Sequence, residues 1–403
     1  MTRNNRLIMF SLFFWGMGEG MWFFIRTLYL EQLGATPTEV GLALSIAALT
    51  IALSFVPGGM LADRFDRKRV LIAGWLSGVF APVLMALAND WRQFMIGFTL
   101  YNASAFVVPA ISTYVAHAAG GAPLERVFPV VFAGFSIGNI LGPQVGQALL
   151  AVTDVRSVLA LSSLLFGVST LAVIFVDAQP VSRQAAPAAR RVSLGDMLRS
   201  TLPFFAFLFV IDFGMTIGMQ LIPNYLGRMS WRLADVSGIG SALPIGVVIL
   251  SVLVGYISAG KRRRGLLAGQ ALVFAAVAAF AYGVPAWGGF AAIGFFMLGG
   301  YQTARQQAAA QVAGYAPSEH RGTALAIAET VGALALAVAS LAGGVLFAGD
   351  PARPFHAAML LIPLGIALTL RLRGLQQKTE HREAAEAAPV RASSAESTYE
   401  QVG

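Results

Sequence analysis

Apolar residues along the chain gather into twelve stretches, and each is long enough to cross the roughly 30 Å hydrocarbon core of a membrane. Short polar segments, which hold most of the charged residues, separate the stretches. The pattern predicts an all-α membrane protein with twelve transmembrane helices, near residues 7–31, 38–60, 70–89, 92–117, 127–150, 156–176, 202–226, 234–258, 266–283, 287–312, 322–347 and 355–374.

The distribution of basic residues predicts the orientation of these spans. An even number of spans places both termini on one side, and that side holds 21 of the 28 Lys and Arg residues. Only five lie in the opposite loops, namely Arg92, Arg156, Arg228, Arg232 and Arg353. Because cytoplasmic loops are enriched in Lys and Arg, we expect both termini to be cytoplasmic and the protein to lie in the cell (plasma or inner) membrane.

Composition agrees with this interpretation and narrows the function. The 403 residues are 57% hydrophobic and 12% charged, and the net charge of +8 comes from short loops, so we expect no nucleic-acid partner. The chain has no Cys, and its four His are scattered without metal-ligand spacing. We therefore expect no metal, no cofactor and no catalytic constellation, and conclude that the protein is not an enzyme.

An internal repeat divides the chain into two halves. A shift of 196 residues carries Tyr29-Leu30 onto Tyr225-Leu226 and Gly59 onto Gly255. We predict an N-terminal six-helix half, a Pro/Ala/Arg-rich cytoplasmic linker, a C-terminal six-helix half of parallel orientation and a disordered cytoplasmic tail, over residues 1–176, 177–200, 201–374 and 375–403.

The segment after the second span, GGMLADRFDRKRV, contains a glycine, an acid and three bases at fixed spacing: Gly59, Asp63, Arg64, Arg67 and Lys68. This segment closely resembles the signature loop between the second and third helices of the major facilitator superfamily, and with the twelve spans and the linker the resemblance covers residues 7–374. It implies two six-helix halves around a midplane site, working by alternating access. It also implies that these residues form a cytoplasmic gating loop, in which Asp63 helps to latch the halves together.

Two local expectations follow for this loop. Gly59 is the small residue that lets two helix ends approach closely. Asp66 stands where the family usually has Gly, and because Asp tolerates left-handed backbone we expect such a turn there. A loop that only sets topology remains the alternative to a latch.

The fifth span carries GFSIGNILGPQVGQ, with a stripe of small residues and a proline at Gly138, Gly142, Pro143 and Gly146. Small residues at every fourth position allow close helix packing, and a proline inside a helix removes a hydrogen bond and bends it. The stripe resembles the antiporter motif of drug-proton exporters in the same superfamily. Ordinary helix packing explains it equally well.

Five charged residues lie inside the predicted spans: Glu19, Arg26, Asp212, Arg305 and Glu329. Charges are costly at mid-membrane, so we expect all five to face the protein interior as candidates for proton coupling or for the substrate cavity. A carboxylate in a low-dielectric cavity with alternating access is suited to carry protons.

For individual residues, alternatives remain open. Glu19 either carries protons, holds substrate or is neutralised by Arg26, which lies two helical turns away. Arg305 and Glu329 either act in transport or pair structurally. Trp15 and Trp22 supply stacking surface for an organic substrate or pack against other helices.

We therefore expect a secondary transporter, monomeric in the lipid bilayer, that uses protons to export a small amphiphilic or drug-like molecule. The alternative is proton-coupled uptake of a sugar or another organic solute.

Overall fold

The computed structural model describes residues 1–179, 194–257, 262–315 and 321–371, and these residues form helices joined by short loops. Most of the predicted linker, the repeat copy at 316–320 and the predicted tail lie outside the described residues. The first part of the chain forms α1 (Arg3–Phe23), α2 (Arg26–Gln32), α3 (Pro37–Arg64), α4 (Arg67–Leu87), α5 (Trp91–Ala103), the short 3₁₀ helix η1 (Ser104–Val107), α6 (Val108–His117), α7 (Leu124–Leu150) and α8 (Val155–Ile174). The second part forms α9 (Leu194–Thr216), α10 (Ile222–Arg228), α11 (Leu233–Gly240), α12 (Ala242–Ile257), α13 (Arg262–Ala278), the π-helical turn η2 (Ala279–Gly283), α14 (Val284–Ala286), α15 (Phe290–Tyr315), α16 (Arg321–Gly349) and a last helix over Arg353–Arg371.

Within the described residues, nine helices are long and apolar enough to cross a membrane, and the bent pair α1 and α2 makes a tenth. These ten coincide with ten of the twelve predicted spans. The other two predicted spans, 202–226 and 287–312, fall on helices α9 and α15. As far as the structure describes them, these two helices are not among those both long and apolar enough to cross a membrane. α9 contains the apolar helix Phe204–Thr216 and ends before α10.

Short polar residues start several of these helices, and their side chains explain where the helices begin. The Asp90 carboxylate accepts the backbone N–H of Gln93, and the Asp154 carboxylate accepts that of Ser157, each at 2.9 Å. Thr36 and Glu39 form a reciprocal capping box at the start of α3. Each cap satisfies backbone donors that the first helical turn leaves free, so local sequence fixes these boundaries.

The glycine stripe of α7 lies directly against α1. A side chain at Gly138 would meet the backbone of Phe13 and Met17, and one at Gly142 would meet the backbone of Met17 and Gly20. The predicted close packing at this stripe is thus present, with helix backbones in contact.

The loop between α3 and α4 differs from both local expectations. α3 continues to Arg64, so Gly59 lies inside the helix, and a Cβ there would meet open space. The neighbouring Gly58 makes the close approach instead, to the backbone of Phe106. Asp66 is not left-handed, since its φ is −53°: it is the N-cap of α4, and its carboxylate accepts the backbone N–H of Lys68 at 2.8 Å. The sequence expectation was wrong because a helix cap serves the same short connection without a special backbone conformation.

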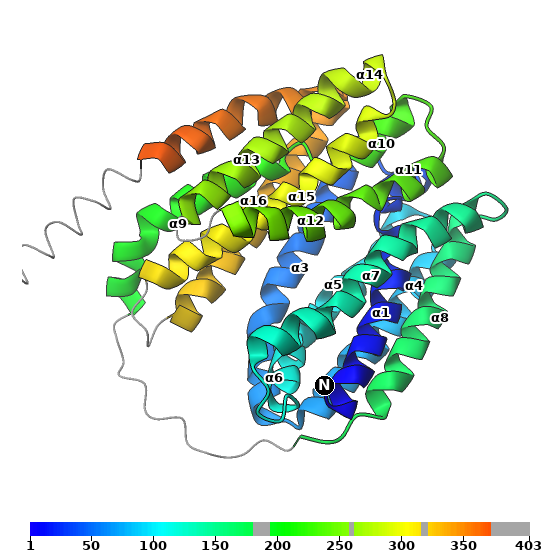
Figure 1. The fold of residues 1–403 in the computed structure, drawn as a ribbon. Coiled ribbons are helices and arrows are strands. Elements are labelled where there is room, and N and C mark those ends of the chain that lie inside the picture. Colours follow the sequence, from blue (N-terminus) through cyan, green and yellow to red (C-terminus); the bar gives the residue numbers. More distant parts are fainter. Residues whose placement is uncertain (180–193, 258–261, 316–320, 372–403) are drawn as a thin grey trace, which may run out of the picture.

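The helices form two groups that meet at one end of the bundle (Figure 1). In the first group α1 packs against α7 and α8; in the second α15 packs against α12 and α13, and α9 packs against α16. The groups contact one another through α3 with α16, α7 with α11, and α2 with α10. The end formed by α2, α10 and α11 is termed the closed end below.

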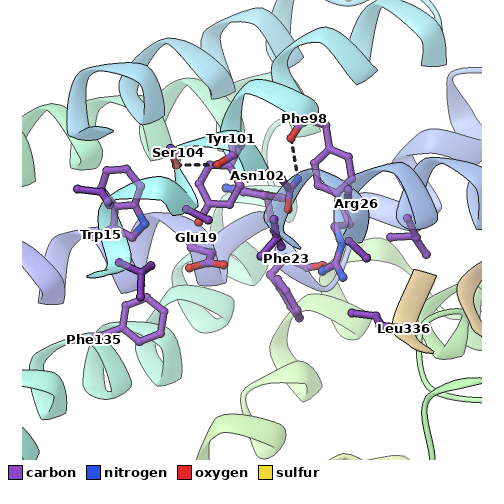
Figure 2. A pocket seen from close by; sticks show the side chains of 18 of the residues that line it. Trp15, Glu19, Phe23, Arg26, Phe98, Tyr101, Asn102, Ser104, Phe135 and Leu336 are labelled. Atoms are coloured by element: carbon purple, nitrogen blue, oxygen red, sulfur yellow. Dashed lines mark hydrogen bonds between the residues drawn. The ribbon is translucent and has the colours of Figure 1, made fainter. Parts of the chain in front are cut away.

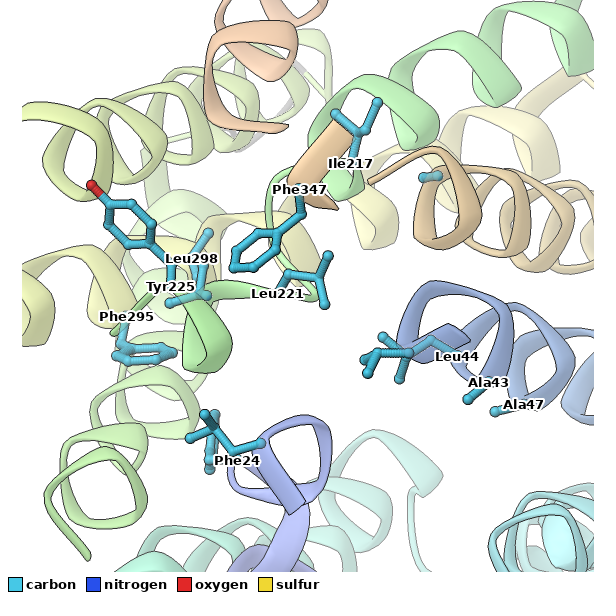
Figure 3. Close-up of a cluster of buried hydrophobic side chains, with 14 of the residues drawn as sticks. Phe24, Ala43, Leu44, Ala47, Ile217, Leu221, Tyr225, Phe295, Leu298 and Phe347 are labelled. Atoms are coloured by element: carbon cyan, nitrogen blue, oxygen red, sulfur yellow. The ribbon is translucent and has the colours of Figure 1, made fainter. Parts of the chain in front are cut away.

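Apolar and polar contacts both join the groups at the closed end. Figure 3 shows Phe24, at the break between α1 and α2, beside Phe295 of α15, with ring centroids 5.7 Å apart. The Asn224 amide donates to the Thr27 carbonyl oxygen at 3.1 Å. Further bonds join the groups in the same region, formed by Arg228 with Glu31, Ser237 with Pro143, and Gln144 with Gly238 and Ser241.

Candidate functional site

Two adjoining cavities lie between the helix groups. The first has a volume of about 480 Å³ and is lined mainly by α1, α3, α5, α6 and α7, with Gln220, Leu336 and Ser340 from the second group. The second, of about 630 Å³, is lined by α1, α7, α12 and α15. Four residues line both: Glu19, Phe23, Phe132 and Phe135. Glu19 thus places a carboxyl group on a wall that the two cavities share.

Glu19 lies in an aromatic environment. Tyr101 and Trp15 line the first cavity together with Glu19. Figure 2 shows the carboxyl group between Trp15, Tyr101 and Phe135. The carboxyl group therefore has the Tyr101 and Trp15 side chains as neighbours and open cavity beside it.

Aromatic rings form much of the first cavity's wall. Trp15 stacks on Phe166, with ring centroids 4.3 Å apart, and lies 5.2 Å from the ring of Trp75. Trp22 meets Tyr101 edge-on at 5.0 Å. Such rings offer large apolar faces whose positions are fixed by their neighbours, as suits flat amphiphilic molecules.

Arg26 lies where the first transmembrane helix breaks. α1 ends at Phe23, α2 starts at Arg26, and the two axes differ by 44°. The guanidinium group donates to the Phe23 carbonyl oxygen and lies over the Phe23 ring, 3.8 Å from its centroid. It also donates to the side-chain oxygen of Gln220, in the second helix group, at 3.3 Å. Arg26 does not form an ion pair with Glu19 in the structure, although it lies within its electrostatic reach.

A second cluster of charges lies in the other helix group. Arg305 of α15 forms an ion pair with Glu329 of α16 and donates to the Tyr301 hydroxyl at 3.4 Å. Gly332, one turn from Glu329, leaves room for the guanidinium group. Asp212 of α9 is only 7% exposed and lies within electrostatic reach of Arg305.

Loss of the Arg305 guanidinium group is expected to destabilise the second helix group. In Arg305→Met, Glu329 and the buried Asp212 lose their positive neighbour, at a cost on the order of 2 kcal/mol, below that of a fully buried pair because Glu329 is half exposed. Thermal unfolding in detergent measures the effect. Adding Asp212→Asn should restore part of the loss; a double variant no more stable than Arg305→Met would show that the field of Arg305 at Asp212 is unimportant.

The structure brings some predicted residues together and separates others. Trp15, Glu19, Trp22 and Arg26 line the first cavity. Neither cavity is lined by Asp212, Arg305 or Glu329. The cluster is connected to the second cavity through Tyr301, which lines that cavity and accepts a hydrogen bond from Arg305. Of the gating-loop residues, Arg64 ends α3, and Arg67 and Lys68 begin α4, while the Asp63 side chain lies outside what the structure describes.

Sequence reasoning missed the tyrosines of the site. Tyr101 lines the first cavity beside Glu19 of α1, and Tyr301 lies within electrostatic reach of Asp212 of α9. Each tyrosine belongs to the fourth predicted span of its half. The repeat shift of 196 carries Tyr101 onto Met297 and not onto Tyr301, so the repeat gave no signal that would have found them.

Comparisons with known proteins agree with this architecture. The model of the Major Facilitator Superfamily matches residues 8–340. A putative sugar efflux transporter of Deinococcus radiodurans is 26% identical over 57% of this chain and 62% of its own length, and the quinolone resistance protein NorA of Staphylococcus aureus is 24% identical over 38% of this chain and 40% of its own. The chain thus spans less than two thirds of the length of the curated relatives it matches. A crystal structure of the nucleoside transporter NupG has a TM-score of 0.74 at 14% identity, covering 92% of this chain and 98% of that one.

The described residues form a helical bundle with many apolar helices and a cavity, as expected of a multi-pass membrane protein. The chain belongs to the Major Facilitator Superfamily, as the resemblance of its second loop predicted. Members of this family are transporters and not enzymes.

Proposed function

We propose that the protein exports a small amphiphilic or drug-like molecule in exchange for protons. The observation that carries this proposal is the position of Glu19, on the aromatic wall shared by two cavities between the helix groups. An acid here can bind either a proton or a positively polarised group of the substrate, and each excludes the other. Such competition is what exchange of substrate for protons requires.

The proposal includes the organisation of the chain. The halves are 1–176 and 201–374, joined by the cytoplasmic linker 177–200 and followed by the tail 375–403, and a single chain transports in the cell membrane with both termini in the cytoplasm. The structure then corresponds to the state closed toward the outside, because the bonds between the groups lie at the end away from the N-terminus. The gating loop with Asp63 latches the cytoplasmic side in the opposite state, and Asp212 is a second proton-carrying candidate.

Uptake of a polar organic solute with protons is the second candidate. Hydrogen-bonding side chains line the second cavity, among them Asn139, Tyr301, Gln302 and Gln306. Groups of this kind suit a hydroxylated solute better than a purely apolar one. The chemical difference between the two cavities is the reason to test both directions.

Transport in oriented vesicles separates these candidates. In everted membrane vesicles with an acidic interior, we expect a fluorescent amphiphilic amine to accumulate and the interior pH to rise faster than in vesicles without the protein. A protonophore should abolish the accumulation, because it removes the proton gradient. Vesicles without the protein are the control. Accumulation of a radiolabelled sugar in right-side-out vesicles together with inward proton flow would instead reject export and support uptake.

A further inference from the structure

We propose that Arg26 transmits substrate binding to the contact between the two helix groups: an oxygen acceptor on the amphiphilic substrate takes the guanidinium N–H that otherwise goes to Gln220. This inference rests on the proposed function in one respect, that the first cavity holds the substrate. It adds a chemical class, amphiphiles with a carbonyl or carboxylate oxygen, and assigns a coupling role to Arg26 and Gln220.

The location of the Arg26–Gln220 bond distinguishes it from the other bonds between the groups. Arg26 and Gln220 both line the first cavity, so a bound molecule can reach the two of them. The other inter-group bonds of the closed end, as far as the structure describes them, are made by residues that line neither cavity: Asn224 with Thr27, Arg228 with Glu31, Ser237 with Pro143, and Gln144 with Gly238 and Ser241.

The bond is also easy to replace. It is 3.3 Å long and joins a charged donor to a neutral amide oxygen. A substrate carboxylate would form a shorter, charge-assisted bond with the same guanidinium group, and a well-placed carbonyl would match the amide. The Phe23 carbonyl accepts from Nη1 of Arg26 and Gln220 accepts from Nη2, so an acceptor that takes the Nη2 donor leaves the Phe23 bond in place.

Two further donors without partners lie on the wall of the same cavity. Trp22 Nε1 and Ser340 Oγ are both buried, in residues 2% exposed, and neither has a hydrogen-bond partner in the structure. Trp22 belongs to α1 and Ser340 to α16, so they come from different helix groups. Buried donors without partners are costly, and an acceptor-bearing ligand would satisfy them.

The backbone around both partners is suited to movement. Arg26 follows the break between α1 and α2, and Gln220 lies in the turn between α9 and α10, at the position that the repeat shift of 196 relates to Phe24. Arg26 thus joins equivalent breaks in the two groups. Release of Gln220 removes a restraint between two segments that ordinary helix bonds do not hold.

The test measures a distance at the closed end. The chain has no cysteine, so Gln32→Cys with Arg232→Cys, one exposed position on each group, provides the only labelling sites for a spin-label distance measurement in nanodiscs. His117→Cys with Arg371→Cys reports on the other end. The probes are 1-naphthaleneacetate and 1-methylnaphthalene, which share a ring system but differ in the carboxylate.

In the otherwise unaltered protein, naphthaleneacetate is expected to lengthen the closed-end distance and methylnaphthalene to leave it unchanged. Gln220→Leu should raise the ratio of open to closed molecules about tenfold without any probe, the effect of losing one charged hydrogen bond. Arg26→Leu should remove the response to naphthaleneacetate. Gln144→Leu is the control: it removes two inter-group bonds outside the cavities, to Gly238 and Ser241, so the response to naphthaleneacetate should persist.

The inference fails if both probes act alike or neither acts, or if Gln220→Leu keeps the closed-end distance and the probe response of the unaltered protein. If Arg26 had only a structural role, Arg26→Leu would change the stability of the protein but would leave the two probes with different effects on the closed-end distance. These distances are measured without a proton gradient, so they do not depend on the direction of transport. If the protein shows the expected probe response but does not export, the proposed export is refuted and the inference stands.

Discussion

Replacement of Glu19 by Gln is expected to reduce proton-driven transport to the level of vesicles that lack the protein. Glutamine keeps the size and the hydrogen-bonding capacity of the side chain, but it cannot exchange a proton with either side of the membrane. Because Glu19 is the acid on the wall shared by both described cavities, no neighbouring carboxylate on that wall replaces it. Binding of the substrate's apolar part should survive, since the aromatic wall is unchanged.

The measurement compares proton-driven uptake into everted vesicles with substrate exchange in the absence of a pH gradient. Exchange should continue in Glu19→Gln when the gradient-driven rate is lost, because it needs only alternating access. Glu31→Gln is the comparison: it removes an acid from the same transmembrane segment that lines neither cavity. This variant also loses the closed-end ion pair with Arg228, yet it should retain proton-driven transport. Wild-type transport with unchanged pH dependence in Glu19→Gln would refute the proton-carrier assignment.

Replacement of Gly142 by Leu is expected to destroy the folded protein. A Cβ at this position would meet the Met17 carbonyl oxygen and the backbone of Gly20, so α1 and α7 would have to separate. Overpacking by movable side chains costs about 1–3 kcal/mol, and a collision with helix backbone exceeds that range because no rotamer change relieves it. Since α1 carries Glu19, even surviving molecules would have a displaced site.

The comparison is with Gly167→Leu in α8. A Cβ at Gly167 meets no atom within 4 Å, and leucine favours a helix over glycine by about 1 kcal/mol. Thermal unfolding in detergent should therefore show a stability equal to or above wild type for Gly167→Leu, and loss of the monodisperse folded protein for Gly142→Leu. Equal stability of the two variants would show that the α1–α7 contact tolerates separation.

Much of the fold follows from local sequence. Ten predicted spans coincide with long apolar helices, because a helix that crosses lipid must satisfy its own backbone and present apolar side chains along its whole length. Start positions such as Asp90 and Asp154 follow from side chains that cap the first turn. The break after α9 was not predicted, although Gly218 lies in the turn at 217–221 and Pro223 follows it in the first turn of α10.

The candidate site was only partly predictable. An acid inside an apolar span must face the interior, so Glu19 was identifiable from its cost in lipid alone. Its neighbour Tyr101 lies on another helix, and tyrosines in membrane proteins are too common to single out by type. The pairing of Arg305 with Glu329 was one of two open interpretations, and the structure contains the ion pair.

The order of residues alone was enough to predict most of the membrane-spanning segments, the family that the chain resembles and the buried charges that need an explanation. These properties depend on the transfer of residues into lipid and on short-range motifs, so each can be recognised within one segment. The folded chain was needed to show that Arg26 bonds to Gln220, 194 residues away, and that Glu19 lies on a wall shared by two cavities. Such contacts depend on how two groups of helices meet, and a single sequence contains no local signal for the partner of a long, flexible side chain.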